Sequence, residues 1–290
     1  MFESRNIVSR RDFLAASAVA AGSLALGRSV GAADDKDPYG GFKMGVQSYS
    51  LRGYKDPKIA LKHTRTLGLK YWEAYPNHIP MGGTPKHIAE QKAILDEAGV
   101  KLLAYGVINF DSNETSARAA FDFAKAMGIV ALSANPKKDK ATFDLLDKLC
   151  EEYEVAIAIH NHGPGALYDK VTDVQEMVKD RHPLVGACVD TGHYLRSDEV
   201  PHEVIEKLGK RVFGVHFKDV KTTVQNGQKR KQFRILGEGD LDTLACLKVL
   251  RKLKFQNCLA LEYEENPDNP LSDIEACLKT VRDAVKKLDA

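Results

Sequence analysis

The stretch that decides the fold runs from residue 142 to residue 160 and reads "TFDLLDKLCEEYEVAIAIH". In its first part, apolar side chains recur three and four positions apart, which predicts an amphipathic helix. The apolar run that follows, at 155–159, predicts a short buried strand that ends just before His160. A helix that leads directly into a buried strand is the repeating unit of an alternating α/β fold.

The same alternation continues along the chain from residue 42. Amphipathic stretches, for example 85–100 and 271–288, separate short apolar runs, and Ser272 is expected to cap the last helix. Eight strands are predicted, at 44–49, 71–75, 101–107, 129–133, 155–159, 186–189, 212–216 and 258–261. Eight strand–helix units in roughly 250 residues predict a parallel sheet closed into a (β/α)8 TIM barrel.

An open, doubly wound sheet is the alternative architecture. It would need a phosphate-binding glycine loop after the first strand, and "QSYSLRGYKD" at 47–56 contains no G-x-G-x-x-G pattern. No Pro-rich or Ser-rich linker divides the chain. We therefore expect a single barrel domain over residues 34–290.

The N-terminal segment has the composition of an export signal. "SRRDFL" at 9–14 pairs Arg10 with Arg11, an Ala-rich apolar stretch follows at 13–26, and small residues precede position 34. This order predicts a signal of the twin-arginine (Tat) type over residues 1–33 and a periplasmic location for the rest of the chain. The apolar stretch is too short for a membrane span. An amphipathic N-terminal helix is the alternative interpretation.

The charge balance excludes one class of partner. The formal net charge of the 290 residues is +2, and the first 33 residues account for it, with four arginines against two acidic residues. The remaining chain is therefore neutral, whereas nucleic-acid binding needs a basic surface. We expect no nucleic-acid partner.

The cysteines show neither a disulfide pattern nor a zinc-binding pattern. Their number is odd, and no C-x-x-C spacing occurs. They are therefore expected to be buried apolar side chains. The five are Cys150, Cys188, Cys246, Cys258 and Cys277.

Titratable side chains collect where the predicted strands end. The carboxyl ends of barrel strands converge on one mouth, so these side chains should lie together. Crowded buried charges are costly unless a counter-charge is present, so the cluster predicts a bound cation. Imidazole and carboxylate ligands favour Mn²⁺, Zn²⁺, Co²⁺ or Fe²⁺ over Mg²⁺. The residues are Glu73, His78, His160, His162, Asp190, His193, His216, Lys218, Glu262 and Glu264.

Six motifs, taken in order, resemble those of the xylose isomerase-like TIM barrels, also called sugar phosphate isomerases/epimerases, a superfamily that includes endonuclease-IV-like proteins. The resemblance implies one divalent metal held by His160, Asp190, His216 and Glu262. It also places Glu73, His193 and Lys218 near the substrate, and we expect His78 to contact it. The motifs are "YWEAYPNH" (71–78), "IHNHG" (159–163), "CVDTGH" (188–193), "VHFKD" (215–219), "LGEGDLD" (236–242) and "LALEYE" (259–264).

One position departs from the family pattern. His160 stands where the family has a glutamate that both binds the metal and moves a proton. A metal-bound imidazole is a poor general base, so epimerisation by two opposed carboxylates is in doubt. The neutral charge also argues against the endonuclease branch.

These observations predict a metal-dependent, isomerase/epimerase-like enzyme that acts on a sugar, keto-sugar or polyol. Because sugar phosphates are mainly cytoplasmic, an exported enzyme should act on an unphosphorylated substrate. Glu262, Glu73 or His162 is expected to move the proton. The alternatives are a lyase or dehydratase acting on 3-keto glycosides and a non-catalytic carbohydrate-binding barrel. The substrate, the native metal and the oligomeric state stay open.

Overall fold

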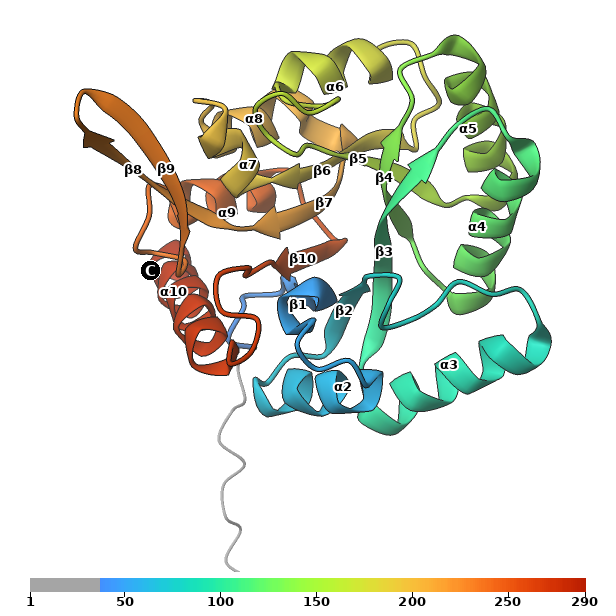
Figure 1. Cartoon of the computed structure of the whole chain (residues 1–290), viewed down its shortest axis with the longest axis horizontal. Coiled ribbons are helices and arrows are strands. Elements are labelled where there is room, and N and C mark those ends of the chain that lie inside the picture. The colour runs from blue at the N-terminus through green and yellow to red at the C-terminus, as the bar shows by residue number, and fades with distance from the viewer. Residues whose placement is uncertain (1–36) are drawn as a thin grey trace, which may run out of the picture. The chain divides into compact units, whose positions relative to one another are not determined.

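The chain folds into a closed barrel of eight parallel strands with helices around it (Figure 1). This computed structural model describes residues 37–290, so the predicted export signal at 1–33 lies outside the described residues. Around the barrel the strands follow the order β1, β10, β7, β6, β5, β4, β3, β2. The predicted TIM barrel is thereby confirmed.

The barrel strands coincide closely with the predicted apolar runs. Their register places the strand ends side by side: His160 is paired with Cys188, and Asp190 with His216. The strands are β1 (Lys43–Gln47), β2 (Tyr71–Ala74), β3 (Lys101–Phe110), β4 (Ala131–Pro136), β5 (Ala156–His160), β6 (Val185–Asp190), β7 (Val212–Phe217) and β10 (Cys258–Leu261).

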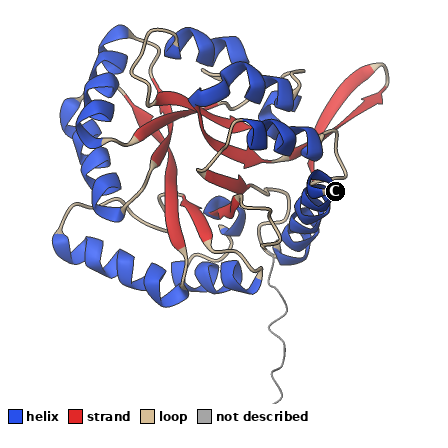
Figure 2. Ribbon diagram, turned by 180° about the vertical axis from the view of Figure 1, so that it is seen from behind, coloured by secondary structure: helices blue, strands red, loops and turns tan. Residues whose placement is uncertain are grey.

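The helices cover the outside of the barrel (Figure 2). Several begin at a side-chain cap; for example, Asp139 accepts a hydrogen bond from the backbone N–H of Thr142. The helices are α2 (Pro57–Thr66), α3 (Pro85–Ala98), α4 (Glu114–Met127), α5 (Lys140–Tyr153), α6 (Val171–Val178), α7 (Thr191–Arg196), α8 (Pro201–Leu208), α9 (Thr243–Lys252) and α10 (Leu271–Asp289), with 3-10 turns η1 (Ser48–Leu51) and η2 (Gly209–Arg211).

The expected N-cap of the last helix is wrong by two positions. Pro270 occupies the N-cap of α10, and Ser272 lies inside the first turn, where its hydroxyl contacts Asp273. Proline has no N–H and a fixed φ, which suits a helix start and moves the boundary upstream. None of the helices within residues 37–290 is long and apolar enough to cross a membrane.

The core lies between the strands and the helices. Fully buried apolar side chains fill it, among them Trp72, Phe143 and Phe217. All five cysteines are buried and free, as the sequence predicted.

A two-stranded hairpin that the sequence analysis did not predict follows β7. Strands β8 (Asp219–Gln225) and β9 (Gln228–Arg234) pair antiparallel and extend outward from the barrel (Figures 1 and 2). Asn226 and Gly227 form its turn with φ of 50° and 74°. Asn-Gly with two positive φ angles is the favoured two-residue hairpin turn, because its twist matches that of the strands.

The hairpin returns to the barrel through the "LGEGDLD" loop, which Asp219 holds. The buried carboxylate of Asp219 accepts backbone N–H bonds from Val220, Gly237, Gly239 and Leu241 at 2.8–3.0 Å. A Cβ at Gly239 would lie 2.1 Å from Asp219 Oδ1, so this close approach requires glycine. One carboxylate therefore closes both ends of the hairpin.

We expect Asp219→Asn to lower the free energy of unfolding by about 2–3 kcal/mol, because the amide nitrogen would face backbone N–H donors that then lose their acceptor. Urea denaturation measures the change. Asp240→Asn is the matched control, since Asp240 lies exposed in the same loop and, among residues 37–290, accepts hydrogen bonds only from Lys221 and Thr222. Equal losses in the two variants would contradict the role of Asp219.

Candidate metal centre and active site

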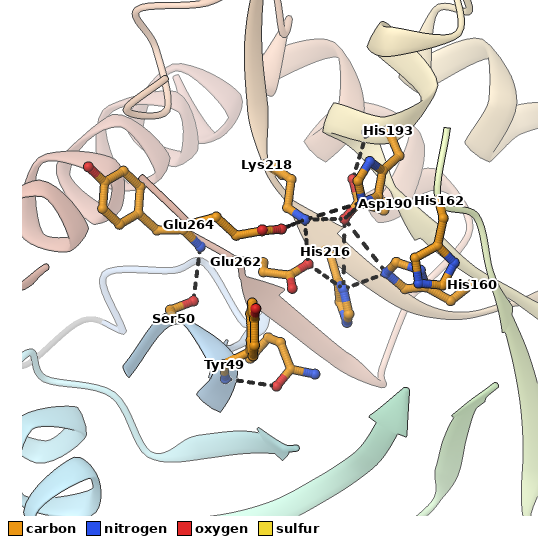
Figure 3. A network of polar contacts seen from close by, with 12 residues as sticks. Tyr49, Ser50, His160, His162, Asp190, His193, His216, Lys218, Glu262 and Glu264 are labelled. Atoms are coloured by element: carbon orange, nitrogen blue, oxygen red, sulfur yellow. Dashed lines mark hydrogen bonds and ion pairs between the residues drawn. The ribbon is translucent and has the colours of Figure 1, made fainter. Parts of the chain in front are cut away.

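Four side chains converge in the mouth of the barrel from four neighbouring strand ends (Figure 3). One nitrogen or oxygen from each lies within 4.8 Å of the other three. This set is called the cluster below. Its members are His160 at the end of β5, Asp190 at the end of β6, His216 near the end of β7 and Glu262 directly after β10.

The facing atoms of the cluster are two imidazole nitrogens and two carboxylate oxygens. His160 Nε2 lies 3.0 Å from His216 Nδ1, which lies 3.0 Å from Glu262 Oε2. Asp190 Oδ2 lies 3.6 Å from His160 Nε2 and 4.0 Å from His216 Nδ1. Four lone-pair donors in so small a space can share one cation.

The burial of the cluster supports this interpretation. Asp190 is fully buried, and its Oδ2 accepts no hydrogen bond within the described residues, although the Lys218 ammonium lies 3.1 Å from it. Burial, with the neighbouring His216 and His162, holds the pKa of His160 well below its usual range, so the ring is neutral, as a metal ligand must be. Two nitrogen and two oxygen donors suit Zn²⁺, Mn²⁺, Co²⁺ or Fe²⁺. The four predicted ligands therefore fit a divalent cation.

Glu73 lies behind the cluster and does not line the cavity described below. It is fully buried; its Oε1 accepts a hydrogen bond from Gln47 at 3.1 Å, and its Oε2 lies 2.9 Å from His216 Nε2. A carboxylate next to the second nitrogen of a metal-ligating histidine fixes the orientation of the ring and raises its basicity. The position of Glu73 thus favours holding His216 over transferring a proton to substrate.

Glu73→Gln is expected to weaken the affinity for a divalent cation about 10- to 100-fold, as is typical when a carboxylate partner of a ligating histidine is lost. Competition with a chelator of known affinity measures this. Glu264→Gln makes the same chemical change at a residue outside the cluster and should leave the affinity nearly unchanged. Equal affinities in wild type and Glu73→Gln would contradict the orienting role.

Lys218 is buried beside the cluster. Its ammonium lies 2.9 Å from Glu262 Oε2 and 3.1 Å from Asp190 Oδ2, and it donates to Glu264. Burial opposes the charge, but the three carboxylates outweigh it and raise the pKa of Lys218. Lys218 therefore stays charged, and its charge is balanced by carboxylates.

A cavity of about 470 Å³ opens above the cluster. His160 and Glu262 reach its floor, and Tyr49, Tyr75 and Phe233 line its walls. This volume suits a small-molecule ligand, and polar groups at the floor with aromatic walls are typical of such sites.

Two further histidines line the cavity. The ring of His162 lies 4.5 Å from that of His160 and 5.8 Å from that of His193, measured between centroids. Burial lowers the pKa of His162, and burial with the charge of Lys218 lowers that of His193 to about 2. His193 Nδ1 lies 3.0 Å from Arg196 Nη1. Both rings are therefore neutral.

His78 does not reach the cavity. Its Nε2 lies 2.9 Å from the carbonyl oxygen of Tyr54, and its ring stacks on Trp72 at 5.6 Å. These contacts give His78, which belongs to the loop after β2, a packing position away from the place expected for a substrate contact.

Sequence reasoning missed several cavity residues, of which four carry aromatic or charged side chains. Phe233 lies on the unpredicted hairpin, which the Asn-Gly turn could have indicated. Arg196 ends the short helix α7, and Tyr49 and Tyr75 follow β1 and β2. No sequence pattern singles these three out from ordinary loop residues.

The chain belongs to the family of xylose isomerase-like TIM barrels, whose family profile matches residues 61–283. The inosose dehydratase of Clostridium perfringens is 23% identical over 259 residues, which cover 79% of this chain and 85% of that enzyme. The inosose dehydratase of Clostridium botulinum is 29% identical over 140 residues, which cover 43% of this chain and about half, 47%, of that enzyme.

Solved structures share the same barrel. The zinc-bound IOLI protein superposes with a TM-score of 0.64 and 19% identity, over 84% of this chain and 98% of that one. The 3-keto-D-glucoside 4-epimerase of E. coli gives 0.63 and 12% identity, over 83% of this chain and 99% of that one. At these identities the likeness establishes the fold.

Proposed function

We propose that this protein is a divalent-metal-dependent lyase that removes water or another leaving group beside the carbonyl of a keto-sugar or keto-polyol. One observation carries the proposal: His160 belongs to the cluster, at the position where the resemblance to the family implies a second acid–base carboxylate. Elimination can use one proton carrier on one face of the substrate, whereas inversion of a carbon is best served by two opposed groups.

The relatives support the substrate class. Inosose dehydratases act on inosose, and the E. coli neighbour is an epimerase of 3-keto-D-glucosides. Both names describe a carbonyl on a polyhydroxylated ring, and the cavity has the size and polarity for such a molecule.

In the proposed elimination, the cluster, His162 and Lys218 have separate roles. A divalent cation held by the cluster would draw electron density from a bound carbonyl and acidify the neighbouring C–H bond. His162, on the cavity wall, takes that proton, and the C–H electron pair becomes the second bond to the next carbon. The bond from that carbon to its hydroxyl breaks, and the imidazolium of His162 returns the proton to the hydroxyl, so that water departs. Lys218 holds Glu262 and Glu264 in place.

Incubation in D₂O with an inosose or a 3-keto glucoside and added Mn²⁺ tests the reaction type. Elimination produces an enone, which absorbs in the ultraviolet, together with water or the released alcohol. An epimerase would instead give an inverted carbon carrying solvent deuterium and no enone, and that result would replace the lyase proposal. A non-catalytic carbohydrate-binding barrel would give neither product.

We also propose that residues 1–33 direct the protein through the Tat route to the periplasm, as "SRRDFL" and the apolar stretch after it favour. Changing Arg10 and Arg11 to lysine should leave the precursor in the cytoplasm. Cell fractionation with an antibody to the barrel measures the distribution. Normal export of the double variant would end the Tat proposal.

A further inference from the structure

Arg196 is a cation on the cavity wall whose charge no acidic side chain balances. It ends α7, is half-buried and lines the cavity beside His162 and His193. Among residues 37–290, no carboxylate lies within 4.0 Å of its guanidinium, although the same cavity contains Glu262 and Glu264. A partly desolvated guanidinium without a counter-charge is unfavourable unless a ligand supplies one.

The guanidinium is held in a fixed place by three neighbours. Arg196 Nη1 donates to His193 Nδ1 at 3.0 Å and to the carbonyl oxygen of His162 at 3.4 Å. Its Cζ lies over the ring of Phe233, 5.6 Å from the centroid. These contacts use one of the two terminal nitrogens and one face of the group. The structure shows no hydrogen bond from Nη2 or Nε to the described residues.

The guanidinium of Arg196 lies close to the cluster. His193 Nε2 lies 4.0 Å from Asp190 Oδ2, while its Nδ1 meets Arg196, so a single imidazole separates the guanidinium from the cluster. Lys218, the other cation of the cavity, is already engaged by three carboxylates. Arg196 is thus the cation left for a substrate that reaches the cluster.

We infer that the substrate carries an oxyanion, which the proposed export favours as a carboxylate over a phosphate, and that Arg196 binds it through its free N–H groups while the sugar lies over the cluster. The inference rests on the proposed function and adds to it the class of substrate: an acidic keto-sugar. A guanidinium presents paired N–H donors that match the two oxygens of such groups. The ring of Phe233 packs against one face of the Arg196 guanidinium. Because Phe233 belongs to β9, the hairpin contributes to substrate selection.

Equilibrium binding of three sugars that differ only at carbon 6 tests this inference. D-glucuronate, D-glucose and D-glucose 6-phosphate are titrated into the full chain with and without Mn²⁺, and the dissociation constants are measured by calorimetry or ligand-observed NMR. We expect an acidic sugar to bind about tenfold or more tightly than glucose, as a charge-assisted paired contact requires. Whether glucuronate or glucose 6-phosphate binds better identifies the oxyanion.

Three variants test whether the preference for an acidic sugar depends on the guanidinium of Arg196 or on positive charge in general. Arg196→Gln should abolish the preference, so that the acidic sugar and glucose bind this variant with similar affinity, and Arg196→Lys should keep only part of the preference. Arg230→Gln removes the same charge from an exposed position of the hairpin and should keep the preference. Circular dichroism checks that each variant is folded.

Two results would overturn the inference. One is the absence of any preference in the wild type, whether the three sugars bind alike or none binds measurably. The other is a preference that survives Arg196→Gln. Because the readout is binding, a charge preference can be observed even if no elimination occurs, so this inference and the proposed function can fail separately.

Discussion

Replacing Asp190 with asparagine is expected to abolish stoichiometric binding of a divalent cation without disturbing the barrel. The two oxygens of Asp190 have separate tasks: Oδ1 accepts the backbone N–H of His193 at 2.7 Å and caps α7, whereas Oδ2 faces the cluster and the Lys218 ammonium, which lies 3.1 Å away. Asparagine is as good a helix cap as aspartate, so the first task survives. The amide nitrogen that replaces Oδ2 has no lone pair to offer, so the second is lost.

Metal content measured by mass spectrometry after loading with Mn²⁺ or Zn²⁺ checks this result. Glu262→Gln, which changes a ligand that follows a different strand, should also abolish metal binding. Asp198→Asn is the matched control, because Asp198 is an exposed carboxylate that pairs with Lys229 and Lys231. Full metal occupancy in both Asp190→Asn and Glu262→Gln would show that the cluster does not hold the cation.

Replacing His162 with glutamine is expected to lower kcat about 10²- to 10⁴-fold, the usual contribution of a general acid–base group, with metal content unchanged. The side chain lies on the cavity wall next to His160 but outside the cluster, so its loss should affect proton transfer and not metal binding. Steady-state kinetics on the keto-sugar that gives enone, together with metal analysis of the same sample, measures the effect.

A partial recovery of the rate with added imidazole would identify the missing group as a proton carrier. His202→Gln, which changes a histidine on α8, serves as the control. An unchanged kcat in His162→Gln would shift the role to Glu262, which shares the cavity. Loss of metal in His162→Gln would instead show that the ring belongs to the metal site.

The fold was predictable because most barrel strands are short and buried along nearly their whole length. A run such as 155–159 can be apolar throughout only if both faces are covered, and the helix before it supplies the cover on one side. The hairpin was not predictable from apolar runs, because most residues of β8 and β9 are polar and few of them are buried. Only the Asn226-Gly227 pair indicated it, through turn geometry rather than burial.

The members of the site were predictable where a residue's position at the end of a strand places it in the mouth of the barrel. His160, Asp190 and His216 end or nearly end neighbouring strands, so convergence follows from the topology. The direction in which a side chain points was not predictable. Glu73 also lies near a strand end, yet its carboxylate contacts the far nitrogen of His216. His78 packs on Trp72 instead of reaching the cavity. Whether a side chain faces the cavity depends on the tilt and register of the strands, which sequence spacing does not reveal.

The way in which the hairpin is fastened has a consequence for how the substrate range of such an enzyme changes over time. Both of its ends are tied to Asp219, and beyond Val220 none of its residues is fully buried. Lengthening or shortening a connection that is closed at its base costs little entropy. The part of the hairpin between its two contacts with Asp219 can therefore be replaced as a unit. A hairpin from a related enzyme would place a different residue at the position of Phe233 and leave the metal ligands unchanged.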